Sequence, residues 1–313
     1  MSAMERADLE SPNDWKQHIE AAESLLICPV CRAGMTATAA CVTCGEQFES
    51  VDGTPKLMSS RSKRAVQYSH CSADSSAGAD FYSALCYPPR PLPAAGANPY
   101  HLDPAHVHVL EQLEPGIRIL EIGCGGGQMR QWSSKHGFDY VGTDISKSRV
   151  SAELQSHGGP DYLCDAHFLP FRDSAFDVVY SAAVTEHIAD PQLMMSEVWR
   201  VLKPGGLYLG NCSFMEPWHD DSFFHMSPLG AYRALTRAQF DVRNVWPGVG
   251  YTGFHALCST CRLPAVGPLL AAVNRLRLTL RSWLGRPDPR GGRIAFDACV
   301  AGAVDWIAAK PLL

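Results

Sequence analysis

Residues 119–127, with the sequence ILEIGCGGG, decide the fold of this chain of 313 residues. The stretch begins with apolar side chains typical of a buried strand, includes an acid at Glu121 and continues into a loop that is almost all glycine. Because glycine has no Cβ, such a loop lets backbone N–H groups approach a ligand closely. The stretch therefore predicts a strand that opens into a ligand-binding turn.

A dinucleotide is the first ligand to consider for this loop. Its fingerprint is G-x-G-x-x-G after a strand. Gly123 and Gly125 fit that pattern, but the third position is occupied by Gln128. The spacing present is instead E-x-G-x-G-x-G, which runs from Glu121 to Gly127. The pattern therefore indicates a ligand other than a dinucleotide.

Three later runs end in polar side chains, as strands of an alternating α/β chain would. The run DYVGTD ends in Asp144, 21 residues after Gly123, where an acid can accept hydrogen bonds from both ribose hydroxyls. The run YLCDA carries Asp165, and the run AFDVVYS ends at Ser181. Ligands of doubly wound sheets bind at the carboxyl ends of the strands. These side chains and Glu121 are therefore predicted to line one site.

Two longer motifs add to this pattern, FDVVYSAAVTEHIADP and RVLKPGGLYL. With the glycine loop, they resemble class I S-adenosylmethionine (SAM) dependent methyltransferases, especially the subgroup of ubiquinone and menaquinone C-methylases. The resemblance covers roughly residues 100–245. It implies that the loop wraps the methionine end and ribose of SAM, and that Asp165 binds the adenine amino group. The cofactor-binding residues so implied are Glu121, Gly123, Gly125, Gly127, Asp144, Ile145, Asp165, Ala166 and Ser181.

The order of elements predicts an α/β fold with a Rossmann-like doubly wound sheet. Strands alternate with helices over residues 117–211, which favours parallel strands covered on both faces. Residues 240–246 are expected to form a sixth strand and residues 303–311 the last one. The resemblance implies that the last strand inserts antiparallel.

Four of the twelve cysteines, Cys28, Cys31, Cys41 and Cys44, form the pattern C-x2-C-x9-C-x2-C. Two such pairs supply four thiolates at tetrahedral spacing, so we predict a structural zinc ribbon. The alternative is two disulfides, which a cytoplasmic setting disfavours. Residues 25–58 resemble the small zinc-ribbon protein that partners and activates tRNA and translation-factor methyltransferases.

The composition predicts a globular cytoplasmic protein. Hydrophobic residues make up 46% of the chain and charged residues 19%, and the net charge of −5 does not suggest a general nucleic-acid binder. No apolar stretch is long enough to span a membrane, and residues 1–20 carry no apolar region of a signal peptide. The predicted segments are a tail (1–24), the zinc ribbon (25–58), a linker (59–99) and the methyltransferase domain (100–313).

The linker has a second interpretation as a cover over the SAM pocket. It is rich in serine, alanine and proline, and its proline-rich end is unable to hold a regular helix or central strand. Phe81, Tyr82 and Tyr87 are the side chains that such a cover would use. The alternative is that these aromatic residues anchor the linker to the domain surface.

A long insertion, residues 247–302, separates the last two predicted strands. Its first part, residues 247–293, holds seven arginines and the single acid Asp288. Apolar residues within 264–284 recur on one face of a predicted helix. We favour a helix packed on the protein's own sheet. The alternatives are a basic amphipathic helix on an anionic membrane, at its inner face, and a lid over a large lipid or glycan substrate.

The chemistry implied by this resemblance is displacement of an activated methyl group, so the protein mainly positions the acceptor. A hydroxyl acceptor also needs a general base. His187 follows the fourth strand, while His219 and His225 lie in the segment that follows the fifth; all three are candidate catalytic residues. His187 and His225 also have a purely structural interpretation. For His225, the resemblance implies that Ser227-Pro228 starts a helix, which His225 would only lead into.

We expect methyl transfer to a small-molecule, lipid or glycan acceptor. An RNA base methyltransferase is one alternative, because bacterial ribosomal RNA guanine methyltransferases also place a zinc ribbon before this fold. The net charge of −5 argues against it. A non-catalytic partner module is the other alternative, and the intact acids Glu121, Asp144 and Asp165 argue against that.

Overall fold

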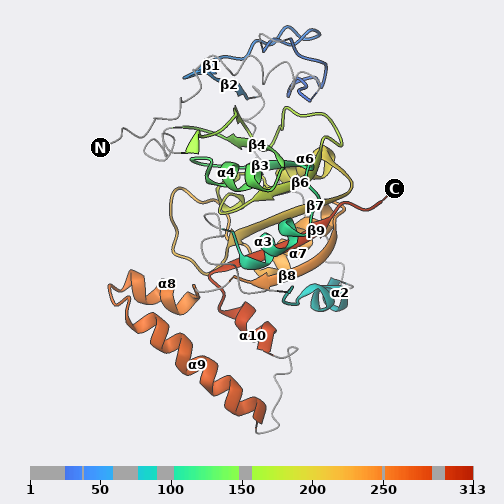
Figure 1. The fold of residues 1–313 in the computed structure, drawn as a ribbon. Coiled ribbons are helices and arrows are strands. Elements are labelled where there is room, and N and C mark those ends of the chain that lie inside the picture. Colours follow the sequence, from blue (N-terminus) through green and yellow to red (C-terminus); the bar gives the residue numbers. More distant parts are fainter. Residues whose placement is uncertain are drawn as a thin grey trace, which may run out of the picture.

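The computed structural model describes residues 25–36, 39–58, 77–89, 102–147, 157–248, 251–283 and 293–312. Within these residues, nine strands form one sheet in the order β1-β2-β5-β4-β3-β6-β7-β9-β8 (Figure 1). The strands are β1 (Ser50–Val51), β2 (Thr54–Leu57), β3 (Arg118–Ile122), β4 (Asp139–Asp144), β5 (Tyr162–Cys164), β6 (Phe176–Ser181), β7 (Leu202–Ser213), β8 (Asp241–Pro247) and β9 (Ala303–Ala309).

The centre of the sheet is parallel, as the sequence predicts. β3 lies between β4 and β6, so that Leu120 is level with Val141 on one side and with Val179 on the other. β5 and β7 continue the parallel pairing on either side. β9 then inserts antiparallel between β7 and β8. The predicted Rossmann-like α/β fold with an antiparallel last strand is confirmed.

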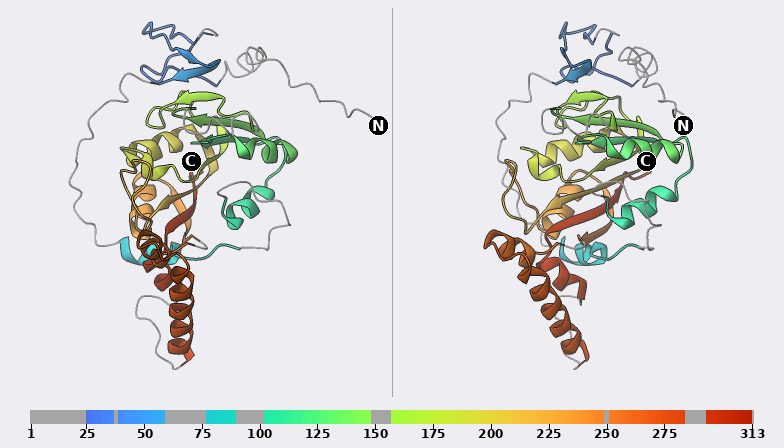
Figure 2. Two further views of the ribbon diagram at one scale, coloured as in Figure 1. Left: turned by 90° about the vertical axis from the view of Figure 1, so that its left-hand side faces the viewer. Right: turned by 60° about the vertical axis from the view of Figure 1, so that its left-hand side comes forward.

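Helices cover both faces of this sheet (Figure 2). α3 and α4 pack on one face over a core that includes Leu110 and Trp246. α2, α6 and α7 pack on the other face over a core that includes Met194 of α6 and Trp306 of β9. The helices are α2 (Ala77–Ala84), α3 (Pro104–Glu111), α4 (Gln128–Lys135), α6 (Pro191–Val201), α7 (Pro228–Arg237), α8 (Gly253–Thr260), α9 (Val266–Trp283) and α10 (Arg293–Cys299), with a 3₁₀ turn η2 (Thr185–His187).

Three of the covering helices begin in the same way. Asp103, Asp190 and Ser227 stand directly before α3, α6 and α7, and each side chain accepts a hydrogen bond from a backbone N–H of the first turn. A proline follows each cap at the first helical position, where its missing N–H is not needed. The helix start that the sequence predicts at Ser227 is therefore confirmed.

The cysteine-rich segment joins the edge of the sheet. β2 pairs in parallel with β5, placing Lys56 level with Leu163 and Leu57 level with Cys164. The side chain of Leu57 is fully buried in the main core. Leu26 forms a further antiparallel bridge with Phe171. The segment predicted as a zinc ribbon is thus hydrogen-bonded into the same sheet that carries the glycine loop. The sequence of the segment does not predict this pairing.

A buried carboxylate reinforces this junction. Arg32 donates to both oxygens of Glu197 on α6, at 2.6 and 3.1 Å. Glu197 also accepts hydrogen bonds from the backbone N–H of Leu169 and from the guanidinium of Arg200. Because Glu197 is only 5% exposed, these hydrogen-bond donors stabilise its negative charge in place of water.

The described part of the linker packs against the body of the domain. Phe81 on α2 is buried with its ring 5.6 Å from that of Tyr232 on α7. Tyr87 donates from its hydroxyl to the carboxylate of Asp297 on α10, at 3.0 Å. These contacts favour surface anchoring over a pocket cover for residues 77–89. The tail (1–24) and the rest of the linker (59–76 and 90–99) lie outside the described residues.

The amphipathic insertion helix is present as α9, but it does not pack on the sheet. It projects from the body, beside α8 (Figures 1 and 2). Its apolar stripe is open to solvent, with Leu269 62%, Val273 55%, Leu276 61% and Trp283 86% exposed. The favoured prediction of a sheet-packed helix is therefore wrong, because periodicity fixes a helix face without naming what covers it. No described helix is both long enough and apolar enough to cross a membrane.

We expect Glu197→Ala to lower the free energy of unfolding by about 3 kcal/mol, because it leaves Arg200 and the Leu169 N–H without their buried acceptor. Arg32→Ala is expected to lower it by less than about 1 kcal/mol, because Arg32 is partly exposed and Arg200 still pairs with Glu197. Urea unfolding of both variants measures this difference. Equal losses for the two variants would contradict the description of Glu197 as the centre of the junction.

Candidate cofactor and active site

The glycine loop joins β3 to α4, and two of its positions require glycine. Gly123 has a φ of 70°, and a β-carbon there would lie 2.2 Å from a methyl group of Val184. Gly127 stands at the start of α4 with a φ of 85°, and a β-carbon there would lie 3.0 Å from the carbonyl oxygen of Gly159. The loop therefore lies tightly between two neighbouring segments, which explains the glycines at these two positions.

Glu121 lies on β3 just before this loop. The hydroxyl of Tyr140 donates a hydrogen bond to its carboxylate. Burial raises the pKa of Glu121 to about 8, while that hydrogen bond and the nearby Arg130 guanidinium act in the opposite direction. Burial therefore favours the protonated form of Glu121, and a positive group that approached it would lower its pKa and favour the carboxylate.

Asp144 at the end of β4 is tied to the glycine loop. Its carboxylate accepts from the backbone N–H of Gly125 at 2.9 Å, and from that of Ile145 at 2.7 Å. The Ile145 side chain is 56% exposed, so it offers an open apolar surface beside the carboxylate. The structure thus brings together the loop and the acid that the sequence predicts to bind ribose.

Asp165 follows β5 and is held by an unpredicted histidine. His167 donates to its carboxylate at 2.6 Å through Nδ1, because Nε2 of the same ring accepts from the backbone N–H of Asp190 at 2.9 Å. The neighbouring Ala166 is buried. Asp165 is itself only 4% exposed, so its orientation is fixed by these contacts.

Ser181 ends β6 within the core. Its hydroxyl shares a hydrogen bond of 2.9 Å with the hydroxyl of Tyr208, and both side chains are fully buried. A contact of Ser181 with a cofactor would therefore have to come from its main chain. The side chain instead fixes the end of β6 to β7.

The three candidate catalytic histidines come together. The rings of His187 and His219 are 5.5 Å apart between centroids, and those of His219 and His225 are 5.9 Å apart. His187 belongs to η2 after β6, and the other two lie in the loop between β7 and α7. Glu186 adds a buried carboxylate, which accepts from the hydroxyl of Ser213 at 2.9 Å.

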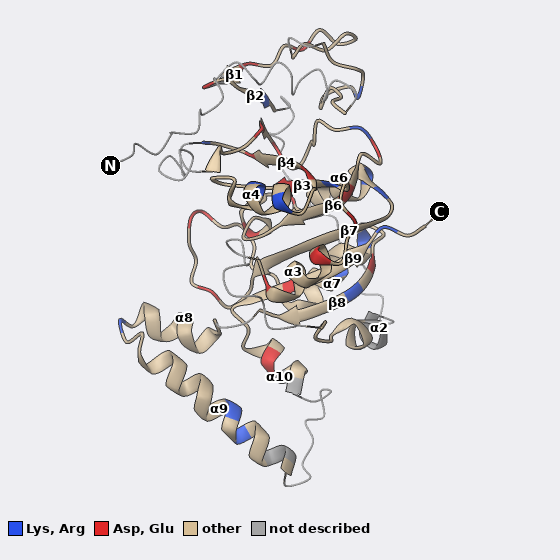
Figure 3. Cartoon of the chain, viewed as in Figure 1, with Lys and Arg blue, Asp and Glu red and all other residues tan. Residues whose placement is uncertain are grey.

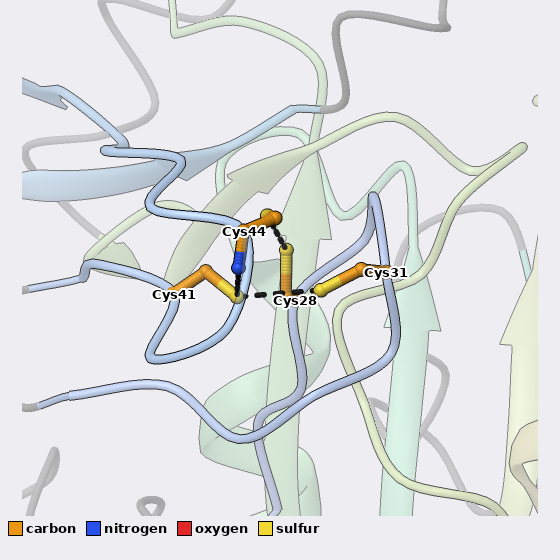
Figure 4. A group of neighbouring side chains, drawn as sticks. All are labelled: Cys28, Cys31, Cys41 and Cys44. Atoms are coloured by element: carbon orange, nitrogen blue, oxygen red, sulfur yellow. Dashed lines mark hydrogen bonds between the residues drawn. The ribbon is translucent and has the colours of Figure 1, made fainter.

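The four cysteines form a separate cluster at the other end of the chain (Figure 4). Their sulfur atoms lie within 4.8 Å of one another, with Cys28 and Cys44 at 3.7 Å and Cys31 and Cys41 at 3.4 Å. Tetrahedral zinc with bonds of about 2.3 Å separates its sulfurs by about 3.8 Å. Backbone N–H groups donate to Cys41 and lower the pKa of its thiol to about 6, whereas burial raises the pKa of Cys28 to about 12. The cluster therefore fits a zinc ion.

Sequence reasoning missed two residues that position this site. His167 orients Asp165, and the motif Asp-x-His at 165–167 is its only local signal. Arg130 on α4 donates to the carbonyl of Gly159 at 2.8 Å and to Asp161 at 3.0 Å, which fixes the segment facing Gly127. These two hydrogen bonds join residues about 30 positions apart, so no local sequence pattern indicates them.

Comparison with known proteins identifies the central segment. Residues 120–210 match the family described as a methyltransferase domain. The chain is 41% identical over 109 residues to 24-methylenesterol C-methyltransferase 2 of Oryza sativa, covering 32% of this chain and 30% of that protein. It is 36% identical over 104 residues to 2-methyl-6-phytyl-1,4-hydroquinone methyltransferase of Synechocystis, covering 31% and 32%.

A third relative is the ubiquinone biosynthesis O-methyltransferase of Coxiella burnetii, 32% identical over 122 residues, which are 36% of this chain and 52% of that protein. The chain thus spans from about a third to about half of the length of these relatives. The match of residues 120–210 to a methyltransferase domain agrees with the order of the strands in this sheet.

Solved structures give weaker likenesses. Phosphoethanolamine N-methyltransferase 2 of Haemonchus contortus with SAM has a TM-score of 0.41 and 20% identity, covering 66% of this chain and 52% of that one. A SAM-dependent methyltransferase of Mesorhizobium loti has a TM-score of 0.41 and 18% identity, covering 65% and 96%.

The raised pKa of Glu121 predicts a pH dependence of stability. The folded protein keeps this proton up to a pH of about 8, while the unfolded chain loses it near the ordinary value of 4.5. Stability from this group is therefore present at low pH and is lost as pH rises through that window. We expect the urea midpoint of the wild type to fall, relative to that of Glu121→Gln, as pH rises from about 4.5 to about 8. Urea midpoints that change in parallel with pH in the two proteins would contradict the raised pKa of Glu121.

Proposed function

We propose that this protein transfers a methyl group from SAM to a small-molecule acceptor. The observation that carries this proposal is the convergence of Glu121, Asp144 and Asp165 at the carboxyl ends of three adjacent parallel strands, around a loop that requires glycine. The match of residues 120–210 to a methyltransferase domain supports it.

Each acid has a distinct role in this proposal. Asp144 accepts hydrogen bonds from the ribose hydroxyls, and Asp165, oriented by His167, accepts from the adenine amino group. Glu121 lies near the positive methionine end, which favours its carboxylate form. SAM supplies the activated methyl group, so the protein's task is to hold the acceptor in line behind it.

The acceptor would lie beside the loop between β7 and α7. This loop presents large apolar side chains to solvent beside the histidines, with Met215 41%, Trp218 74%, Phe223 62% and Phe224 42% exposed. Such a surface suits an apolar acceptor with a polar reacting group. Three relatives are named for a sterol, a hydroquinone and ubiquinone, which supports that class.

The cofactor site is tested by titration calorimetry with SAM. Asp144→Ala removes the acceptor for the ribose hydroxyls, so we expect SAM to bind at least tenfold more weakly, a change of about 1.4 kcal/mol or more. Asp139→Ala is the matched control, because Asp139 begins the same strand and pairs with Arg118 at its opposite end. Equal affinity of all three proteins for SAM, or no binding by the folded wild type, would contradict the proposal.

We propose that Cys28, Cys31, Cys41 and Cys44 hold a structural zinc ion. The support is the fit of their sulfur separations to tetrahedral zinc and the backbone donors to Cys28 and Cys41. The described cysteines form no disulfide, so these thiols are free to bind metal. The ion would fix the loops that lead into β1 and β2, and through β2 the edge of the sheet.

We also propose that α9 lies on an anionic lipid surface. Its exposed stripe includes Leu269, Val273, Leu276 and Trp283, and the helix carries arginines but no acid (Figure 3). Arg275 and Arg277 are both exposed. Apolar side chains that enter the headgroup region, together with arginines that pair with lipid phosphates, are the features of a helix in a membrane interface. Such a location would bring the protein close to apolar acceptors.

Sedimentation with vesicles tests this surface. The wild type is expected to bind phosphatidylglycerol vesicles more tightly than phosphatidylcholine vesicles. Replacing Arg275 and Arg277 by glutamine is expected to weaken that binding about 30-fold, because each arginine near an anionic surface contributes about 1 kcal/mol. Val42→Ser is the control, since Val42 is 66% exposed but lies in the cysteine-rich segment. Failure of the wild type to sediment with anionic vesicles would overturn the membrane proposal.

A further inference from the structure

A second group of metal-binding side chains lies on the acceptor side of the methyltransferase domain. Glu186 and His187 belong to η2, directly after β6, and His219 lies in the loop after β7. Each offers one potential ligand atom, and these atoms all lie within 4.8 Å of one another. This group is distinct from the four cysteines.

The carboxylate of Glu186 is at most half satisfied. The side chain is 1% exposed, and one of its oxygens, Oε1, lies 2.9 Å from the hydroxyl of Ser213, whose single proton also lies within reach of Oε2 of Glu216 at 2.8 Å. The other oxygen of Glu186, Oε2, is buried without a hydrogen-bond partner among the described groups. An acceptor oxygen left bare in the interior is strongly destabilising, and a bound cation is one way to compensate it.

Both imidazoles have a nitrogen that can offer a lone pair. Nδ1 of His187 is likewise buried and lacks a hydrogen-bond partner within the described chain. Nδ1 of His219 lies 2.8 Å from the carbonyl oxygen of Pro217. A carbonyl only accepts, so this Nδ1 carries the proton and a neutral His219 keeps its lone pair on Nε2. A backbone carbonyl that fixes the tautomer in this way is a common support for a metal-binding histidine.

We propose that Glu186, His187 and His219 bind a divalent transition-metal ion. Two imidazole nitrogens and one carboxylate oxygen suit Zn²⁺ and its neighbours in the first transition row, whereas Mg²⁺ prefers oxygen ligands alone. Ligand atoms around tetrahedral zinc are separated by about 3.4 Å, so binding would draw the His219 loop inward. Three protein ligands leave a coordination position for a further oxygen.

This site deepens the proposed function, on which its catalytic use rests. An acceptor hydroxyl that occupies the open position loses its proton to water more readily, because the ion stabilises the resulting oxyanion. A lone pair of that oxygen then forms a bond to the methyl carbon of SAM. The carbon–sulfur bond breaks, and its electron pair stays on the sulfur of S-adenosylhomocysteine. The ion thereby selects oxygen acceptors, such as a phenol, over carbon acceptors.

Metal stoichiometry tests the site without any acceptor. The full chain is saturated with Zn²⁺, freed of excess by gel filtration, and its bound zinc is measured by elemental analysis. We expect two zinc ions per wild-type chain, one at the four cysteines and one at Glu186, His187 and His219. His219→Ala and Glu186→Gln are each expected to retain one. His225→Ala, a histidine of the same loop outside the group, is expected to retain two.

Substitution with Co²⁺ distinguishes the two sites. Only the cysteine site has thiolate ligands, so only this site gives intense sulfur-to-metal charge-transfer bands. Loss of the second site is therefore expected to leave those bands intact and to remove only weak visible absorption. A single zinc in the wild type, or two in His219→Ala, would overturn the proposal. SAM affinity measured on the same samples separates the metal site from the proposed function. A wild type that binds two zinc ions but no SAM would contradict the proposed function and leave the metal site standing.

Discussion

The close contact between Gly123 and Val184 is the constraint on which the active site depends. It brings the loop that follows β3 directly against the segment that follows β6, with room for a hydrogen atom and none for a methyl group. The segment that contains Val184 continues into Glu186 and His187. A single missing side chain therefore sets how far the segment with Glu186 and His187 lies from the glycine loop.

Main-chain pairing at the sheet edge links the cysteine cluster to the same site. β2 hydrogen-bonds to β5, and Asp165 follows β5 directly. Lys147, three residues after Asp144, also donates to the carbonyl of Asp52 between β1 and β2, at 3.3 Å. The cysteine-rich segment thus contacts both the strand and the turn next to two of the acids predicted to bind the cofactor. A metal that orders this segment would stabilise this edge of the sheet as well.

Local patterns predicted the parts of this structure that are themselves local. The glycine loop, the strands that end at Asp144 and Ser181, and the cap at Ser227 depend on short-range signals that the chain states plainly. The pairing of β2 with β5 and the contact of Arg32 with Glu197 join residues more than 100 positions apart, and no periodicity carries that information. α9 shows the same limit, because its stripe predicted a helix and not its surroundings.

A crystal structure with S-adenosylhomocysteine would show whether the three acids hold the cofactor. We expect the amino-acid end of the ligand against Gly123 and Gly125, its ribose hydroxyls within hydrogen-bond distance of Asp144, and its adenine amino group facing Asp165. We also expect the sulfur to face His187. A ligand bound elsewhere, or one whose ribose lies away from Asp144, would contradict the proposed cofactor site.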